Sequence, residues 1–548
     1  AIPGKELTRP EPQPHAYGAL GYGELRNPVK EPRASHIYFV VRDDTRRADV
    51  VVQVSDLTWA AYNSYGGTST YGSFDPSNPS PRCLKSSLNR PLNTRDHRSA
   101  NTLWTSEYPL IRWLESSGYD VAYVSGVDTS RLPPEYFLRF RVFVSSGHDE
   151  YWAGSQRRTI EEALGRGLHL MFLSGNEMFW KVRWEDSPVA DPLECDVAAL
   201  PLPAERFRTM VCYKESQSDV KIDPKKDEWT GTWRDARSIN PEGASPENAI
   251  AGTLFGVNAW RNDPLVVPAE YRALRFWRNT TISELRDGER VVLKAGLLGH
   301  EWDVDIDNGF RPPGLFHMST THVDNVLYIM DHGSVYDSGS ATHHLTMYRH
   351  ESGALVFASG TCQWSWGLDA FHDSETGVPA QLANAYNQRL GYDILGVEPD
   401  IQQATVNVLA DMGVQPTTLA SSLVPATMST DQSPPVSQVI YPDAMASQQG
   451  SVRLIVYAND EAPGCVAAVE VSVDGGSTWH PAVRTAMIDE LGKKKQSPFQ
   501  ETPCLPLWSY DVPFSILNEQ DTILTRAFDD SGNMEDLTSG DETVLLIS

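Results

Sequence analysis

Three ionisable residues stand side by side in the motif SGHDEYW: His148, Asp149 and Glu150. They follow the apolar run Arg141–Ser145, which predicts a buried strand, and Gly147 permits a tight turn before them. Adjacent charges repel one another unless a cation or a hydrogen-bond network compensates them. Glu150 could therefore bind a metal while His148 moves protons. Alternatively, Asp149 and Glu150 simply cap the helix that follows, because acids favour helix N-termini.

Tyr62 and Asn176 follow two further predicted strands, Val50–Val54 and Leu168–Leu173. As a phenolate, Tyr62 would be a hard oxygen donor suited to a trivalent ion; otherwise it is a packed aromatic. The Asn176 amide could orient a carbonyl oxygen, or the residue could serve only a turn. Parallel strands end on one edge of a sheet, so we expect these loops and the loop of His148 to meet in one pocket.

Glu301 is another candidate, an acid among aromatic residues in the motif GHEWD. Apolar surroundings would raise its pKa, whereas a surface ion pair is the ordinary alternative. The six cysteines show no CxxC spacing, and none follows the strand ends named above. The sequence therefore predicts neither a thiolate zinc site nor a cysteine nucleophile.

Strands and helices alternate through the first half of the chain, which predicts a doubly wound α/β domain with a mostly parallel sheet. Apolar runs predict the strands His36–Val41, Ala48–Val54, Asp120–Val124, Arg141–Ser145 and Leu168–Leu173. Helical spacing of apolar residues predicts the helices Tyr108–Ser117 and Ser155–Arg166, the first of them stopped by Gly118.

We expect four regions along the 548 residues. Residues 1–35 are rich in Pro and Gly and predict an extended arm, and residues 36–400 form the α/β domain. Residues 401–436, with their Pro, Ser and Thr, predict a connector. Residues 437–548 alternate polar and apolar residues, which predicts an all-β sandwich of immunoglobulin type.

The composition excludes several functions. Asp and Glu number 72 against 46 Lys and Arg, a formal charge of −26, and this field repels nucleic acid and anionic membrane surfaces. No apolar run reaches the roughly 18 residues that a membrane span needs. There is no P-loop, no strand-linked GxGxxG, no GxSxG and no HExxH, which disfavours NTPases, nicotinamide enzymes, serine α/β-hydrolases and zincins.

Several separate motifs resemble the large (beta) subunit of N,N-dimethylformamidase, in the right order between residues 36 and 400. They are SDLTWAAYNSYGG, SSGHDEYW, FLSGNEMFW and LLGHEWDVDIDNG. The resemblance implies an α/β fold akin to class I glutamine amidotransferases and ThuA-like proteins, and a mononuclear ferric (Fe3+) centre that hydrolyses a small amide. It also implies that the chain acts together with a small partner subunit.

Carried over by motif, the resemblance implies that Glu150 and Tyr62 are metal ligands and that His148 is the general base beside them. Asn176 would hold substrate or water. A second tyrosine ligand is expected, and we favour Tyr38 over Tyr65. Together with Glu301, these residues form the predicted site.

We therefore expect a metal-dependent amidohydrolase that acts on a small linear amide and assembles as a homo-oligomer. The alternative is a secreted binding or structural protein that retains the fold and pocket without turnover and recognises carbohydrate through its Trp residues. The first residue is not Met, the connector is rich in Ser, Thr and Pro, and Cys465 could pair with Cys504. These features favour a location outside the cytoplasm, with the cytoplasm as the alternative.

Overall fold

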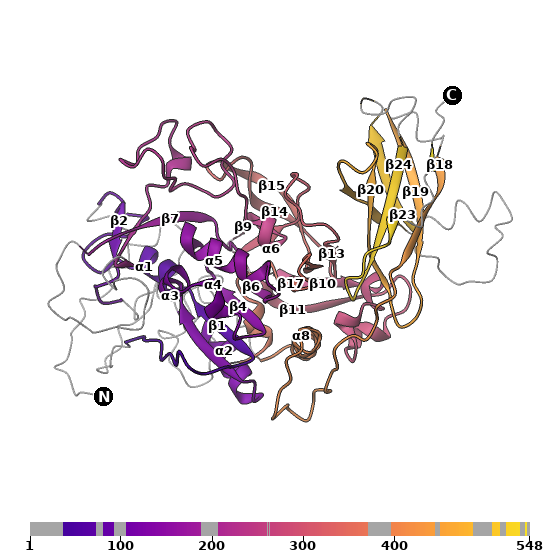
Figure 1. The fold of residues 1–548 in the computed structure, drawn as a ribbon, viewed down its shortest axis with the longest axis horizontal. Coiled ribbons are helices and arrows are strands. Elements are labelled where there is room, and N and C mark those ends of the chain that lie inside the picture. The colour runs from indigo at the N-terminus through magenta and orange to yellow at the C-terminus, as the bar shows by residue number, and fades with distance from the viewer. Residues whose placement is uncertain are drawn as a thin grey trace.

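The computed structural model places a large N-terminal part beside a smaller C-terminal one (Figure 1). It describes residues 37–72, 80–92, 103, 106–187, 207–259, 261, 263–370, 396–443, 450–485, 507–513, 515, 522–537 and 543–544. The predicted N-terminal arm, residues 1–35, lies outside the described residues. The chain is a mixed α/β protein with several sheets.

A seven-stranded sheet forms the centre of the larger part. In spatial order its strands are β13 (Phe316–His317), β16 (Thr346–Arg349), β17 (Leu355–Ala358), β6 (His169–Ser174), β4 (Val142–Gly147), β1 (Val50–Val54) and β3 (Val121–Ser125). The five strands from β17 to β3 are parallel, whereas β16 and β13 run antiparallel at one edge. Strand β1 is buried along its whole length, as expected for a parallel strand covered on both faces. Four of the five predicted strands are thus confirmed.

The fifth predicted strand, His36–Val41, is wrong for its described part. Residues 37–41 have no regular structure, and Ile37, Phe39 and Val41 are 85%, 79% and 76% exposed. Alternating apolar residues make a strand only where a neighbouring strand supplies hydrogen bonds and a core covers one face.

Helices cover both faces of the central sheet. Their bounds are α1 (Asp56–Tyr62), α2 (Glu107–Ser116), α3 (Gly126–Arg131), α4 (Pro134–Phe137), α5 (Gly154–Leu164), α6 (Asn248–Ala251) and α8 (Pro399–Asp411). Leu110 of α2 and Ile401 of α8 pack in the core on one face, and Phe137 of α4 and Ile160 of α5 pack on the other. None of the described helices is long and apolar enough to span a bilayer.

Helix α2 ends where the sequence predicts. Gly118 adopts a φ of 72°, a left-handed conformation that glycine enters without a steric penalty. Its N–H donates to Glu115 O at 3.0 Å and the N–H of Tyr119 donates to Leu114 O at 3.1 Å, so the last carbonyls of the helix are satisfied. Helix α8, in contrast, overlaps the stretch predicted as a connector, and it is buried in the main core along most of its length.

Three smaller sheets surround the central one. The first contains β2 (Lys85–Ser87), β8 (Thr209–Val211), β7 (Trp180–Glu185) and β5 (Tyr151–Ala153). The second contains β12 (Glu301–Val304), β9 (Leu254–Asn258), β14 (Thr321–Ile329) and β15 (Tyr336–His343). The third pairs β10 (Asp263–Pro268) with β11 (Arg290–Leu298). The first two bring β5 and β12 to the carboxyl ends of the central strands.

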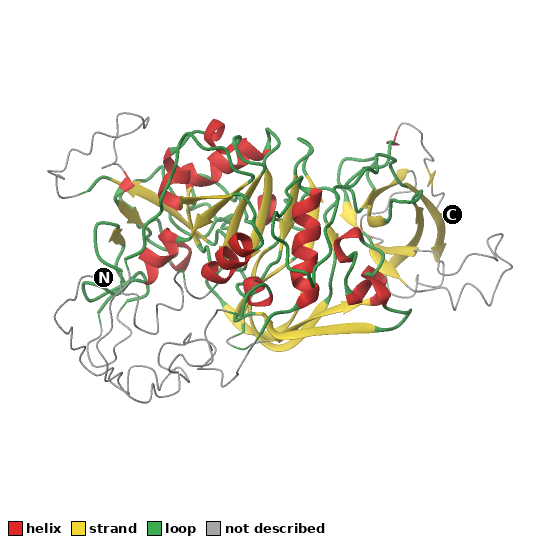
Figure 2. Ribbon diagram, turned by 90° about the horizontal axis from the view of Figure 1, so that it is seen from below, coloured by secondary structure: helices red, strands yellow, loops and turns green. Residues whose placement is uncertain are grey.

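The C-terminal part is built from strands, whereas the helices gather in the larger part (Figure 2). One of its four-stranded sheets contains β18 (Val436–Asp443), β19 (Ser451–Asn459), β23 (Leu507–Pro513) and β22 (Val483–Thr485). The other contains β21 (His480–Pro481), β20 (Val466–Ser472), β24 (Thr522–Asp529) and β25 (Thr543–Val544). Val456 of β19 and Val469 of β20 share one core, so the two sheets pack face to face. Gly314 N donates to Glu470 Oε1 at 2.8 Å and joins this part to the larger one.

Candidate functional site

The turn after strand β4 places three ionisable side chains at the edge of the central sheet. It ends at Gly147, whose φ of 83° turns the chain so that His148, Asp149 and Glu150 follow in buried positions. Strand β5 comes next, and helix α5 begins only at Gly154. The acids therefore do not cap helix α5.

Glu150 accepts hydrogen bonds from two phenols. The Tyr62 hydroxyl donates to Oε2 at 2.8 Å, and the Tyr71 hydroxyl lies 2.7 Å from Oε1 and 2.9 Å from Oε2. The two rings pack together with their centroids 4.6 Å apart. Thr58 Oγ1 accepts from the Glu150 N–H at 3.0 Å, so helix α1 fixes this backbone as well. Two phenols and one carboxylate thus place their oxygen atoms within hydrogen-bond distance.

Tyr71 occupies the place that the sequence assigned to a second tyrosine. Tyr38, the residue we favoured, makes an edge contact with Trp59 at 5.3 Å between ring centroids. Tyr65 is 52% exposed. The structure therefore places the hydroxyl of Tyr71, which was not predicted, against the Glu150 carboxylate. Sequence reasoning missed Tyr71 because nothing in its local pattern distinguishes it from a packed aromatic.

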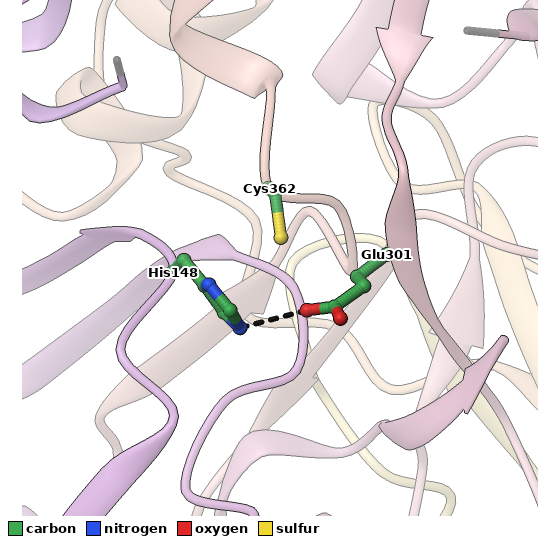
Figure 3. A group of neighbouring side chains, drawn as sticks. All are labelled: His148, Glu301 and Cys362. Carbon is green, nitrogen blue, oxygen red and sulfur yellow. Dashed lines mark ion pairs between the residues drawn. The ribbon is translucent and has the colours of Figure 1, made fainter. Parts of the chain in front are cut away.

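His148 forms a buried pair with Glu301, the first residue of β12. His148 Nε2 lies 2.7 Å from Glu301 Oε2 (Figure 3). It also lies 3.5 Å from Glu150 Oε2. Burial lowers the pKa of His148, but the charge and hydrogen bond of Glu301 outweigh it and raise the pKa to about 9. Burial opposes ionisation of Glu301, yet His148 brings its pKa down to about 2. The sequence-based expectation of a raised pKa at Glu301 is therefore wrong, because the neighbour that decides it is a cation.

Asn176 sits at the end of β6 and joins this pair. Its Nδ2 donates to Glu301 Oε2 at 3.0 Å and lies 3.1 Å from His148 Nε2, while its buried Oδ1 has no hydrogen-bond partner among the described residues. The residue adopts a φ of 54°, and its N–H donates to Asp303 Oδ1 at 2.8 Å. Asp303 lies two residues after Glu301 on the same strand, so β12 fixes both the amide and the carboxylate.

Gly175 lets these segments approach one another. A Cβ at this position would lie 2.8 Å from the backbone N of Cys362 and 2.9 Å from the backbone O of Glu301. Both are contacts that a side chain could not make without moving the backbone. The absence of a side chain therefore brings the Cys362 loop, which follows β17, against the site. Cys362 Sγ donates to Gly175 O at 3.4 Å.

Lys214 is a further residue that sequence reasoning did not find. It is 2% exposed, adopts a φ of 49°, and holds Nζ 3.3 Å from the ring centroid of Tyr71 and 4.7 Å from that of Trp180. Burial lowers the pKa of Lys214 to about 8, although the Glu150 charge opposes this shift. Burial and the Glu150 charge nevertheless raise the pKa of Tyr71 well above its usual value, so the phenol keeps its proton.

The structure thus gathers five of the six predicted site residues and leaves one outside. Those gathered are Tyr62, His148, Glu150, Asn176 and Glu301. The carboxylates, the imidazole and the amide can hold and transfer protons, and the phenol and carboxylate oxygen atoms can ligate a hard cation.

Two families of known proteins match the chain. Residues 25–378 match the family described as N,N-dimethylformamidase beta subunit-like, C-terminal. Residues 433–538 match the Mo-co oxidoreductase dimerisation domain. No curated protein matches the chain.

The second match corrects the predicted cofactor. A dimerisation domain of Mo-co oxidoreductases points to a molybdenum cofactor rather than to iron, so the expectation of a mononuclear ferric cofactor is wrong. The described side chains around His148 hydrogen-bond directly to one another. This packed cluster does not fit a group as large as a molybdenum cofactor.

Proposed function

This chain belongs to the N,N-dimethylformamidase beta subunit-like family, and from that premise we propose that it hydrolyses the C–N bond of a small amide at the cluster around His148. The observation that supports the proposal is the buried pair of His148 Nε2 and Glu301 Oε2, 2.7 Å apart, at the carboxyl edge of the parallel strands. Ligands of open α/β sheets bind at this edge.

The proton transfers of amide hydrolysis fit the pair. The neutral form of His148, which its pKa of about 9 makes the main form only above that pH, takes a proton from the attacking water and returns it to the leaving nitrogen. The Glu301 carboxylate stabilises the imidazolium formed between these two steps, and Asn258 Nδ2 holds the other carboxylate oxygen at 3.0 Å. The Asn176 amide lies beside both groups, where it can orient the substrate carbonyl.

Tyr62, Tyr71 and Glu150 form the second half of the proposed site. Each phenol oxygen lies 2.7 to 2.9 Å from a carboxylate oxygen of Glu150, and phenolate and carboxylate oxygens suit a hard metal cation. Such a cation, when bound, would polarise the amide carbonyl as a Lewis acid. Burial and the Glu150 charge raise the pKa of Tyr71 well above its usual value, so a cation bound here would have to displace the phenol proton.

An assay of amide hydrolysis tests this function. The purified chain is incubated with a series of formamides and acetamides that differ in N-methylation, and release of amine and carboxylate is followed. Hydrolysis that is lost in His148→Ala and retained in His322→Ala, which changes a solvent-exposed histidine of β14, supports the proposal. A folded protein that binds these amides without releasing amine would instead be the binding protein of the alternative reading.

Two further proposals concern the fold of the enzyme and its assembly and location. We propose that the central sheet follows the doubly wound arrangement of class I glutamine amidotransferase-like proteins and that the C-terminal sandwich is immunoglobulin-like. We also propose a homo-oligomer that pairs through the sandwich, with a small partner subunit, outside the cytoplasm; the dimerisation-domain match supports the homo-oligomer. Sedimentation of the purified chain tests the homo-oligomer, since a monomer at all concentrations contradicts it.

A further inference from the structure

We propose that His148, Glu301 and Cys362 form a second metal site, for a borderline-soft divalent cation such as Zn2+, and that occupation of this site inhibits the enzyme. The three side chains are shown together in Figure 3. One ligand atom from each, an imidazole nitrogen, a carboxylate oxygen and a thiol sulfur, lies within 4.8 Å of the other two. Nothing in the family matches assigns a metal to this set.

The donor types select the cation. Nitrogen, oxygen and sulfur donors are the set that Zn2+ binds in proteins, whereas the neighbouring phenol and carboxylate oxygens suit a harder ion. The sequence predicted no thiolate zinc site because its cysteines lack the usual spacing. The three residues come from separate segments, the turn after β4, the start of β12 and the loop after β17, which only the folded chain brings together.

The three proposed ligands are buried, and a polar atom beside them is available for a further hydrogen bond. His148, Glu301 and Cys362 are 8%, 6% and 1% exposed. Asn176, 1% exposed, reaches both His148 and Glu301, and its Oδ1 lacks a hydrogen-bond partner within the described part of the chain. A water molecule bound to the cation as a fourth ligand could donate to this oxygen.

Occupation would remove the proton that His148 and Glu301 share. A cation between Nε2 and Oε2 takes the same lone pairs as that proton, and it also displaces the thiol proton from Gly175 O. His148 could then no longer accept a proton from water. The inhibition therefore rests on the proposed hydrolase function, whereas the binding of the cation does not.

Cobalt substitution tests the binding. Co2+ added to the full purified chain should give a thiolate-to-cobalt charge-transfer absorption, and Zn2+ should displace it. The band should vanish in Cys362→Ser and Cys362→Ala, with Zn2+ affinity reduced at least about tenfold. It should persist in Cys465→Ser, which changes a free thiol of the sandwich, and in Tyr62→Phe, which changes the neighbouring oxygen cluster.

The spectra of the wild type and of the two Cys362 variants decide the outcome. Absence of a thiolate band, or a band that survives in both Cys362 variants, overturns the site. Zn2+ should also inhibit amide hydrolysis in the wild type and inhibit Cys362→Ala at least about tenfold less strongly. If no amide is hydrolysed, the proposed function fails, but the cobalt spectrum still tests the metal site.

Discussion

His148 Nε2 and Glu301 Oε2 lie 2.7 Å apart, and this contact joins the central parallel sheet to the sheet of β12. It is the charge of Glu301 that keeps a proton on a buried imidazole, since burial alone would remove it. The packing of the two sheets therefore determines the protonation of His148.

Replacing Glu301 with Gln removes this charge while keeping the shape of the side chain. We expect kcat/KM for the amide substrate to fall by about 100-fold, because the imidazolium formed during the reaction loses its counterion. The pKa of His148 should fall from about 9 towards or below the ordinary histidine value, which NMR titration measures. Glu270→Gln, at a solvent-exposed position, should leave both quantities unchanged. An unchanged His148 pKa in Glu301→Gln would contradict this account of the pair.

Three tyrosine variants separate the oxygen ligands from their neighbours. Tyr62→Phe and Tyr71→Phe each remove a hydroxyl bonded to Glu150 and should reduce activity by about tenfold or more. Tyr38→Phe should have little effect, because the Tyr38 ring packs against Trp59 instead. Steady-state kinetics of the three variants under one condition give the comparison. Full activity in Tyr71→Phe, with loss in Tyr38→Phe, would restore the earlier assignment.

Asp303 positions Asn176 by accepting its backbone N–H, so replacing Asp303 should also disturb the side-chain amide of Asn176. Asp303→Ala leaves the buried N–H of Asn176 without an acceptor, which costs about 1 to 3 kcal/mol of unfolding free energy. Asp303→Asn keeps an oxygen at Oδ1 and should lose much less. Denaturant unfolding measures the stability, and kcat should fall in the Ala variant and recover in the Asn variant. Equal losses in both variants would show that the charge, rather than the hydrogen bond, matters.

His169 should make the fold sensitive to acid. Burial lowers its pKa to about 4, and its Nδ1 accepts the N–H of Leu355 at 2.8 Å, so the folded chain keeps the imidazole neutral. Its folded pKa lies below the ordinary value of about 6.5, so its contribution is fully present above pH 6.5 and is lost as the pH falls towards 4. Between pH 7.5 and pH 5 this loss amounts to roughly 2 kcal/mol.

Urea unfolding at the two pH values measures that loss. The difference between pH 7.5 and pH 5 should shrink in His169→Gln, which retains a side-chain acceptor, and should remain in His322→Gln, at an exposed histidine. A His169→Gln protein with the full wild-type pH dependence would assign the acid sensitivity to other groups.

Local sequence patterns located the framework of the site. The helix that ends at Gly118 and the strands before Gly147 and Gly175 lie within a residue or two of their expected bounds. Apolar periodicity and glycine conformation act over a few neighbouring residues, so they can be read along the chain. The same reasoning brought His148, Glu150 and Asn176 to one sheet edge, because parallel strands share their direction.

Contacts between segments that are distant in the sequence could not be predicted from local patterns. Local pattern does not distinguish Tyr71 from Tyr38, yet it is Tyr71 whose hydroxyl donates to Glu150, because the loop after α1 folds back over that helix. Glu301 has a lowered pKa since β12 places it against a cation, and Cys362 reaches the site because Gly175 lacks a side chain. Sequence patterns reveal which residues can do chemistry, whereas the charges and atoms beside them come from other strands, and only tertiary packing determines those neighbours.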